Sequence, residues 1–458
     1  MTHFNPDPLL VRKYNQALPR YTSYPTVPFW NDQIDKKSWE VAFLEQFGIQ
    51  NHKKAISIYV HLPFCESLCT YCGCNKRITT NHNVEEEYLA AIEKEWSLYR
   101  NLMPEMPVIR EIHLGGGTPT FFSPANLQRL ISTILEKSIV DSRHEFSIEG
   151  HPNNTTKEHL QTLFSLGFRR ISYGVQDNDP SVQRIINRIQ PLENVRKATE
   201  NARTVGFTSV NYDLIYGLPL QTLSSIGKTI GEVVKLNPDR IAFYSYAHVP
   251  WTSKGQRLFD VTHLPSAEEK INLYLKGKVL LMKHGYRDIG MDHFALPHDA
   301  LYKAKVKNQL HRNFMGYTTQ NSGLLLGLGV SAISDLGNSF AQNEKTLHEY
   351  YNSCNEKKLA VKRGIFLSQE DLVFRRYILD ISCRGGTAFN ALHLPLLQEL
   401  CFPKLKELEA DGLVEYDETH LKVTDLGHYF IRNICSAFDL YLQRNQHNNK
   451  NQMFSKAI

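Results

Sequence analysis

The sequence lacks an apolar run long enough to cross a membrane. Its longest apolar stretch, residues 324–333, is far shorter than the ~20 residues of a membrane-spanning helix and contains two glycines. Residues 1–10 are polar, include two prolines and lack the apolar core of a signal peptide. We therefore expect a cytoplasmic chain with no membrane span.

The net charge of the chain is also small. The 52 Lys and Arg residues exceed the 47 Asp and Glu residues by only 5. That excess does not indicate a nucleic-acid partner, and it is compatible with a small anionic substrate. Hydrophobic residues make up 42% of the chain and charged residues 22%, which excludes a mainly disordered protein. The 26 glycines and 20 prolines follow no repeat, which excludes a collagen-like one.

Short β-rich runs alternate with amphipathic helical patterns through the first two thirds of the chain. Six strands are predicted, at residues 56–60, 111–114, 145–148, 170–173, 210–215 and 240–244. Between them, Ser123 before Pro124 predicts one helix start, and Thr155 with Glu158 predicts another as a capping box. Serial strand–helix units favour an α/β fold with a parallel sheet, here a partial (β/α)6 TIM-like barrel. Active residues then belong at the C-terminal ends of the strands.

The two ends of the chain differ from this pattern. Residues 1–45 show little periodicity and predict an extended N-terminal arm, whereas 46–345 form the predicted catalytic domain. After Ser368, a helix, a hairpin turning at 417–420 and a further helix predict a mainly helical, winged-helix-like domain over 365–458. No basic recognition helix is present, so we expect this domain to serve packing or to act as a lid. The residues from His447 onward form a predicted polar tail.

The eight cysteines are unevenly spread. In a reducing compartment they are more readily ligands or core thiols than disulfides. Four are isolated and are predicted to be buried: Cys354, Cys383, Cys401 and Cys435. The other four, Cys65, Cys69, Cys72 and Cys74, fall within ten residues directly after the first predicted strand.

The spacing of the clustered cysteines favours an iron–sulfur cluster. C-x3-C-x2-C supplies three thiolates, from Cys65, Cys69 and Cys72, and leaves one iron of a [4Fe–4S] cluster open for a ligand. With Cys74 as a fourth ligand, zinc is the main alternative, although the single residue between Cys72 and Cys74 strains that arrangement. Structural thiols are the third possibility.

At this point the sequence resembles a known family. C-x3-C-x2-C with an aromatic residue before its last cysteine is the signature of radical S-adenosylmethionine (SAM) proteins. More specifically, the chain resembles the oxygen-independent coproporphyrinogen III oxidases over nearly its whole length. The matching segments are RYTSYPT at 20–26, YVHLPFC at 59–65, GGGTPT at 115–120, GVQD at 174–177, DLIYGLP at 213–219, GMDHF at 290–294, HRNF at 311–314 and RNIC at 432–435.

The resemblance implies a set of cofactor-binding residues. Cys65, Cys69 and Cys72 would hold a [4Fe–4S] cluster, and two SAM molecules would lie beside it. Positions that match the first SAM site are Tyr59, Gly116, Glu149 and Ile333, and those that match the second are Tyr71, Gly117, Thr118, Gln176, Arg188, Asp213 and Ala247.

The residue types themselves support several of these positions. Glycines at 115–117 let backbone groups approach a ligand closely, although many such runs are simple turns. Glu149 suits the hydroxyls of a ribose, or is a solvated loop residue. Asp213 stands in an otherwise apolar strand, where a buried carboxylate needs a partner, and Arg188 is the natural candidate. The two residues would either bind SAM or form a structural ion pair.

The resemblance also implies the reaction. A 5′-deoxyadenosyl radical would take hydrogen from substrate propionates, and loss of CO2 would convert coproporphyrinogen III to protoporphyrinogen IX in haem biosynthesis. Such an oxidoreductase needs an electron-donor protein such as a flavodoxin or ferredoxin, and we expect it to be a monomer. No individual catalytic side chain is assigned. Candidates to meet the carboxylates of the tetrapyrrole substrate are Arg20, Tyr21, His293 and Arg312.

Three positions depart from the family pattern, and other functions stay open. His151 stands where an acidic residue is usual, Asn178 where an aromatic is usual, and Met315 where a glutamine is usual. These departures bear on substrate or efficiency rather than on radical chemistry. The alternatives are a radical SAM relative that acts on haem or another tetrapyrrole by methyl transfer, a cluster-bearing haem carrier, and a zinc-dependent winged-helix regulator.

Overall fold

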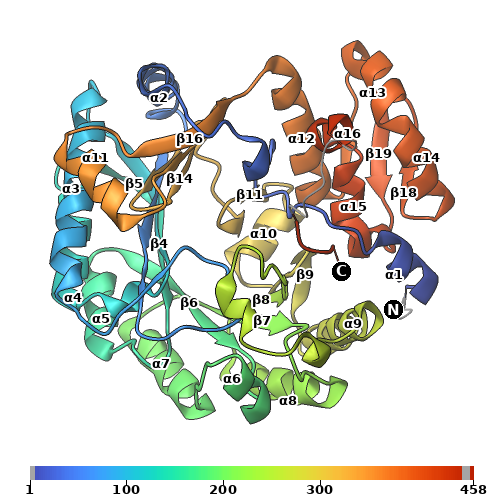
Figure 1. Cartoon of the computed structure of the whole chain (residues 1–458), viewed down its shortest axis with the longest axis horizontal. Coiled ribbons are helices and arrows are strands. Elements are labelled where there is room, and N and C mark those ends of the chain that lie inside the picture. The colour runs from blue at the N-terminus through green and yellow to red at the C-terminus, as the bar shows by residue number, and fades with distance from the viewer. Residues whose placement is uncertain (1–5, 446–453, 458) are drawn as a thin grey trace.

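The computed structural model describes residues 6–445 and 454–457, so the predicted polar tail falls largely outside the described residues. Within them, a twelve-stranded sheet forms the centre of the molecule, in the order β16-β15-β14-β13-β1-β4-β5-β6-β7-β8-β10-β9 (Figure 1). Seven neighbouring strands are parallel: β13 Leu325–Leu328, β1 Ile56–Leu62, β4 Val108–Gly116, β5 Ile139–Gly150, β6 Phe168–Gln176, β7 Ser209–Tyr216 and β8 Arg240–Ser245.

All six predicted strands are therefore confirmed, and they pair in sequence order. The observed strands are longer than the predicted ones. The first half of β5, for example, is largely exposed and has no apolar alternation to mark it. Antiparallel strands extend the sheet at both edges: β14 Ile333–Asp335, β15 Ser339–Asn343, β16 Val361–Phe366, β10 His293–Ala295 and β9 Arg287–Gly290.

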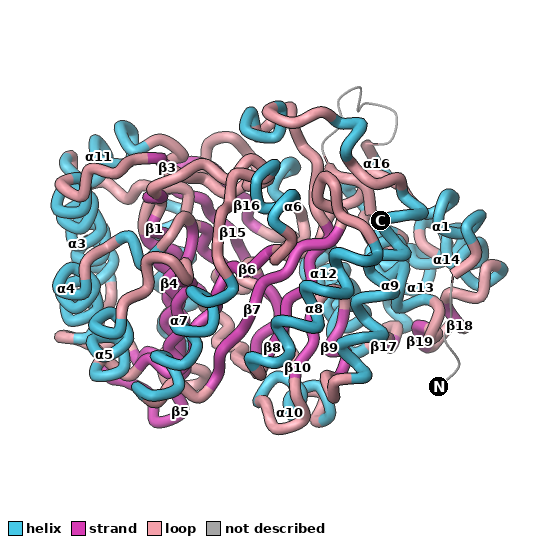
Figure 2. Tube along the Cα trace, turned by 90° about the horizontal axis from the view of Figure 1, so that it is seen from below, coloured by secondary structure: helices cyan, strands magenta, loops and turns pink. Residues whose placement is uncertain are grey.

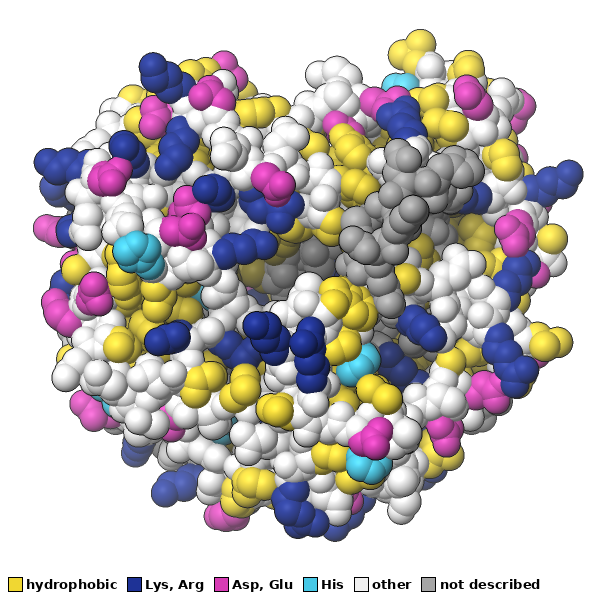
Figure 3. Space-filling model, viewed as in Figure 1, with side chains coloured by type: hydrophobic (Ala, Val, Ile, Leu, Met, Phe, Trp, Pro, Cys, Tyr) yellow, Lys and Arg dark blue, Asp and Glu magenta, His cyan; other side chains and the backbone are white. Residues whose placement is uncertain are grey.

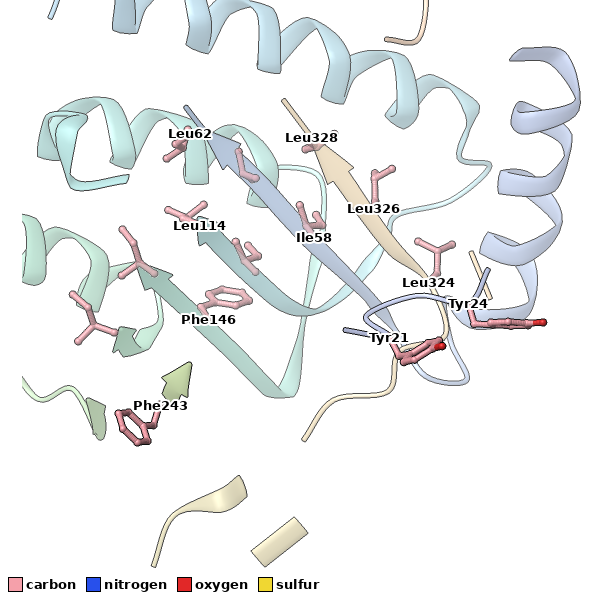
Figure 4. Close-up of a cluster of buried hydrophobic side chains, with 14 of the residues drawn as sticks. Tyr21, Tyr24, Ile58, Leu62, Leu114, Phe146, Phe243, Leu324, Leu326 and Leu328 are labelled. Carbon is pink, nitrogen blue, oxygen red and sulfur yellow. The ribbon is translucent and has the colours of Figure 1, made fainter. Parts of the chain in front are cut away.

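Helices on the outer face connect the parallel strands. They are α3 Val84–Leu102, α4 Pro124–Leu135, α5 Lys157–Ser165, α6 Pro180–Ile185, α7 Leu192–Val205, α8 Leu223–Val233 and α9 Ala267–Lys283 (Figure 2). Serial strand–helix units of this kind build the barrel-like core. Side chains of its strands form one apolar cluster, part of which is drawn in Figure 4, with Ile58, Leu114, Phe146 and Leu326 fully or nearly fully buried.

Two helix starts test the capping predictions. Ser123 accepts a hydrogen bond from the Asn126 amide and begins α4 as predicted. The capping box of α5 lies one residue later than predicted, because Thr156 pairs with His159 rather than Thr155 with Glu158. The buried His159 imidazole also bonds the Phe122 carbonyl at 2.9 Å, which fixes this register, while Glu158 faces solvent.

The N-terminal segment is not extended throughout, contrary to the prediction. It contains α1 Pro8–Tyr14, a 3-10 turn Val27–Phe29, and the start of α2 Lys36–Gln50. Trp39, Phe43 and Phe47 of α2 are four residues apart and fully buried, a helical spacing that was present in the sequence. Tyr21 and Tyr24, between the two helices, are buried near Leu324, which directly precedes β13 (Figure 4).

The C-terminal segment follows the predicted helix–hairpin pattern. Its helices are α12 Gln369–Arg384, α13 Leu394–Leu400, α14 Phe402–Ala410, α15 Ile431–Ser436 and α16 Leu440–Arg444. A small sheet, β17 Gly386–Ala388, β18 Val414–Tyr416 and β19 His420–Val423, forms the wing. The division at 1–45, 46–345 and 365–458 stays a prediction.

The remaining elements are short. They are β2 Phe64–Cys65, β3 Arg77–Ile78, β11 His311–Asn313, β12 Gly316–Thr318, α10 Ala300–Val306 and α11 Leu347–Asn355. The four isolated cysteines are buried, as predicted. In the part of the chain described, no helix is both long and apolar enough to span a membrane.

Candidate active site

A cavity of about 590 Å³ opens at the C-terminal ends of β1 and β4 to β7, where parallel strands present their loops. The three cysteines of the C-x3-C-x2-C motif line it together with Cys74. So do eight of the eleven residues that match SAM positions, namely Tyr71, Gly116, Gly117, Thr118, Glu149, Gln176, Arg188 and Asp213.

The cysteine loop is closed at its base and held along its length. Strands β2 and β3 pair at Cys65 and Ile78, so the two ends of the cysteine loop lie side by side. The Thr118 hydroxyl donates to Cys65 Sγ at 3.3 Å. Asn187 donates to the Leu68 carbonyl at 2.8 Å, and Gln256 donates to the Tyr71 carbonyl at 2.9 Å. The fold thus orients the thiols into the cavity before any ligand binds.

Gly116 and Gly117 are required by packing against the cysteine-bearing strand. A Cβ at Gly117 would lie 2.5 Å from the Pro63 carbonyl oxygen, and Gly116 has a φ of +116° with the His61 ring 2.7 Å from its ideal Cβ position. From the sequence, these glycines were predicted to let backbone groups approach a ligand closely. In the structure the absent Cβ atoms face protein, and this close contact lets the turn border the cavity.

Arg188 and Asp213 both reach the cavity, but they do not pair with each other as predicted. Arg188 donates to the Gly174 carbonyl at 2.5 Å and to Cys69 Sγ at 3.6 Å, and its buried Nε has no partner. Asp213 accepts hydrogen bonds from Ser172 at 3.0 Å and Asn211 at 2.8 Å. The strand neighbours of Asp213 therefore satisfy its carboxylate, which leaves Arg188 directed at the cysteine loop.

Burial, followed by the nearby charge of Glu149, raises the pKa of Asp213 to about 7. An acid whose folded pKa is raised destabilises the fold as pH rises from its ordinary value of 3.8 towards 7, and the full penalty applies above that. Asp213→Asn removes the penalty but keeps only one of the two acceptor oxygens.

We therefore expect Asp213→Asn to stabilise the metal-free protein by about 2–4 kcal/mol at pH 8 and hardly at pH 4. Urea unfolding at both pH values measures this. Asp288→Asn, at an ion-paired site outside the cavity, is the control and should show no such gain at pH 8. A loss of stability at pH 8 for Asp213→Asn would contradict the expectation.

Glu149 is held at the cavity wall rather than free in solvent. Its carboxylate accepts a hydrogen bond from the Gly116 amide at 3.2 Å and lies 3.4 Å from His113 Nε2. Glu149 belongs to β5 rather than to a loop, and its side chain, which is 44% exposed, borders the cavity. Its position beside the Gly116 turn leaves it able to accept hydrogen bonds from a ligand.

Three residues that match SAM positions lie outside the lining of this cavity. The Tyr59 hydroxyl contacts His61 Nδ1 at 3.0 Å. The Ala247 carbonyl accepts from Gln256 at 3.1 Å, and Ile333 packs against a cluster around Trp30 and Phe340.

The substrate candidates occupy two smaller cavities. Arg20 and Arg312 line one of about 70 Å³. His293 lines another of about 90 Å³, which shares Glu149, Ser172, Asp213 and Tyr244 with the large cavity. Burial lowers the pKa of His293 to about 4, so this imidazole is neutral at pH 7. Tyr21 lines neither of these two cavities. Its buried hydroxyl donates to Asp439 at 3.1 Å.

Two of the three departures from the family pattern lie at these cavities. His151 lines the large cavity, where burial and then Arg188 lower its pKa to about 3. Met315 lines the cavity of His293. Asn178 lies elsewhere and donates to Glu232 at 3.0 Å.

The sequence reasoning missed some lining residues. Ser172 and Tyr244 border both the large cavity and that of His293. Both belong to predicted strands. Alternation along β6 was the signal that could have found Ser172, whereas the first four residues of β8 are all buried and give no such signal for Tyr244. Arg170 and Arg240, which also line the cavity of His293, are buried and paired with Glu145 and Asp299.

Comparisons with known proteins agree with this geometry. Residues 59–233 match the model of the radical SAM superfamily, and residues 367–430 match that of the HemN C-terminal domain. Oxygen-independent coproporphyrinogen III oxidase of Salmonella typhimurium is 40% identical, over 99% of this chain and 98% of the relative. That of Synechocystis is 39% identical, over 98% and 97%. The solved coproporphyrinogen III oxidase (HemN) of Escherichia coli, a radical SAM enzyme, is 38% identical, with a TM-score of 0.88 over 96% of this chain and 100% of that one.

The fold and the cysteine-lined cavity define a radical SAM enzyme, and this class uses a [4Fe–4S] cluster and SAM. Within that class, the chain belongs to the family of oxygen-independent coproporphyrinogen III oxidases. The residues present fit both groups. Three thiols of one loop enter a single cavity, and the buried, unpartnered Nε of Arg188 lies at its wall.

Proposed function

We propose that the protein catalyses the anaerobic oxidative decarboxylation of coproporphyrinogen III to protoporphyrinogen IX in haem biosynthesis. In each of two rounds, the β-carbon of one propionate would give a hydrogen atom to the 5′-deoxyadenosyl radical. CO2 would then leave and one further electron would pass to an electron acceptor, which leaves a vinyl group. The observation that carries the proposal is one cavity lined by cysteines together with a second cavity lined by Arg20, Arg312 and Arg432. The relatives named for this reaction support it.

Cys65, Cys69 and Cys72 would hold the cluster, and the adjacent turn at 116–118 would hold SAM beside it. When bound, these groups supply the one-electron cleavage of SAM that yields a 5′-deoxyadenosyl radical. Glu149 accepts hydrogen bonds from a bound nucleoside, and its link to the Gly116 amide fixes its orientation. Ile215 and Tyr244 at the cavity wall help to exclude water.

A second SAM would be held by other residues of the same cavity. Tyr71, Gln176, Arg188 and Asp213 lie there, at the ends of β6 and β7 and in the cysteine loop. Gln176 has a φ of +66°, a strained conformation that often marks a functional position. Asp213 and the free Nε of Arg188 offer an acceptor and a donor to the two ends of an amino acid group.

The propionates of the substrate are held by the neighbouring cationic group. Arg20, Arg312 and Arg432 line one cavity, with Asp292 as the acidic residue among its lining. Lys270 lies close by, where burial and then Arg20 lower its pKa to about 7. Arg432 binds the carbonyls of Leu18 and Pro19, and so attaches the N-terminal arm to this group. A tetra-anionic substrate offsets the repulsion between these cations.

Arg312→Gln tests this placement. The buried Nε and Nη1 of Arg312 have no partner, so both are available for a carboxylate. We expect KM for coproporphyrinogen III to rise about tenfold to a hundredfold with a small change in kcat, since hydrogen bonds to charged groups contribute about 1.5–3 kcal/mol. Steady-state kinetics measures this, with Arg110→Gln, paired with Asp141 at the start of β4, as control. An unchanged KM would contradict the placement.

The reaction itself is tested anaerobically with reconstituted protein, SAM, dithionite and coproporphyrinogen III. Mass spectrometry should show a product lighter by two CO2 and four hydrogens. A product heavier by a CH2 unit would indicate methyl transfer instead. Haem binding without SAM cleavage would indicate a carrier.

We also propose the setting in which the protein works. Eight free cysteines suit the reducing cytoplasm. A single chain contains the complete cavity, so a monomer suffices. The barrel at 46–345 performs the chemistry, and the arm at 1–45 and the domain at 365–458 close around the substrate. The electrons come from a carrier protein.

A further inference from the structure

A surface segment outside the cavity packs against the cysteine loop. Residues 249–258 lie directly against it, since the Ser253 hydroxyl donates to the Cys72 carbonyl at 2.7 Å and Gln256 donates to the Tyr71 carbonyl at 2.9 Å. Gly73 and Cys74, at the tip of the loop, are exposed. The cysteine loop and this segment therefore form one continuous piece of the molecular surface.

Large apolar side chains are exposed on this segment. Trp251 is 40% exposed and Leu258 is 68% exposed. A tryptophan at the surface is costly to hydrate and is enriched at the centres of protein interfaces. Nothing in the barrel chemistry requires these two side chains to face outward.

Basic residues lie on the same segment and on both sides of the cysteine loop. Lys254 and Arg257 belong to the segment, Arg77 follows the cysteine loop, and the Lys345 carbonyl accepts a hydrogen bond from Asn75 of that loop at 2.9 Å. All four are exposed, and among the described residues none of them forms an ion pair. Figure 3 shows Lys and Arg side chains beside the hollow in the middle of this face.

Acidic residues balance only part of this charge: Asp32 interacts electrostatically with Lys345 but also lies 3.8 Å from Arg363. Glu66 lies 4.0 Å from His82, and Asp260 caps a 3-10 turn by accepting from the Thr262 amide. The four unpaired cations leave a positive surface next to the cysteine loop. Such a surface attracts an acidic partner and accelerates its encounter.

We propose that the carrier face, defined as Arg77, Trp251, Lys254, Arg257, Leu258 and Lys345, docks a small acidic flavodoxin that delivers single electrons. The inference rests on the proposed function, because that reaction requires reduction of the group held by Cys65, Cys69 and Cys72. In each delivery the flavin of the carrier loses one electron and that group gains one. Electron-transfer complexes use small, transient interfaces, which suits two apolar anchors within a ring of charge.

The test compares a double charge reversal with a matched control. Lys254→Glu with Arg257→Glu changes the carrier face, whereas Lys228→Glu with Lys235→Glu makes the same change at the end of α8, away from the cysteine loop. Calorimetric titration of the iron-loaded full chain with an acidic oxidised flavodoxin gives Kd. We expect the reversal at 254 and 257 to raise Kd at least tenfold at low salt and to abolish most of its salt dependence. The control should leave Kd within twofold.

Two reductants separate this inference from the proposed function. With dithionite, which needs no docking, the charge-reversed variant should turn over like the unaltered protein, whereas with reduced flavodoxin its rate should fall at least tenfold. Absence of vinyl product with dithionite in the unaltered protein would overturn the proposed function. Intact dithionite turnover with an unchanged flavodoxin Kd in the variant, or with no flavodoxin binding by the unaltered protein, would overturn the carrier face.

Discussion

Cys65→Ser is expected to remove the iron and to abolish turnover together. Cys65 stands in β2, where its thiol accepts a hydrogen bond from Thr118 and faces the cavity with Cys69 and Cys72. A serine oxygen is a poor ligand for an iron–sulfur cluster, which is normally held by thiolates. Two remaining thiols do not hold the cluster. Iron and sulfide analysis, absorbance near 400 nm and anaerobic product formation measure the loss.

Two other cysteines provide the controls for this experiment. Cys354→Ser changes a buried thiol on α11 and should keep the full iron content. Cys74→Ala should also keep the iron, because the motif supplies three ligands without it. Zinc in the purified protein, or loss of metal on Cys74→Ala alone, would favour the four-thiolate zinc site and would contradict the radical mechanism.

Arg188→Met is expected to lower turnover by about a hundredfold, within the range found when one preorganised charged donor is removed from an active site. The guanidinium lies at the cavity wall, is fixed by the Gly174 carbonyl and donates to Cys69 Sγ. Methionine fills a similar volume but removes the charge and every donor. Iron content should change little, since the three thiols remain.

Binding measurements distinguish a ligand-holding role of Arg188 from a structural one. Equilibrium dialysis with labelled SAM should show fewer SAM molecules per chain or a weaker Kd, while the unfolding midpoint stays within a few degrees. Arg184→Met is the matched control, because Arg184 is exposed and donates only to Ser181 nearby. Unaltered SAM binding and turnover in Arg188→Met would remove Arg188 from the site.

Much of the catalytic domain was predictable because its signals are local. Most of the six strands alternate polar and apolar residues, as EIHL at 111–114 and EFSI at 145–148 do, and this two-residue period is a local signal of a strand. Ser123 before Pro124 marks α4 by the same short-range chemistry. The cysteine motif was equally predictable, since three thiolates within eight residues restrict the metal groups that they can hold. The N-terminal helix α2 was also encoded locally, by Trp39, Phe43 and Phe47, and was overlooked among aromatic and Pro-rich neighbours.

What the sequence by itself determined was the order of strands and helices, the cysteine loop and the family resemblance. Only the tertiary structure decided which polar groups meet. Asp213 accepts hydrogen bonds from Asn211 on its own strand and from Ser172 on the adjacent strand. Arg188 donates to Cys69, and the buried Tyr21 hydroxyl donates to Asp439. The tertiary structure also places segment 249–258 on a loop some 180 residues away in the chain. The reason is physical: propensities and motifs act over a few residues, whereas hydrogen-bond partners are fixed by strand register and packing between distant segments.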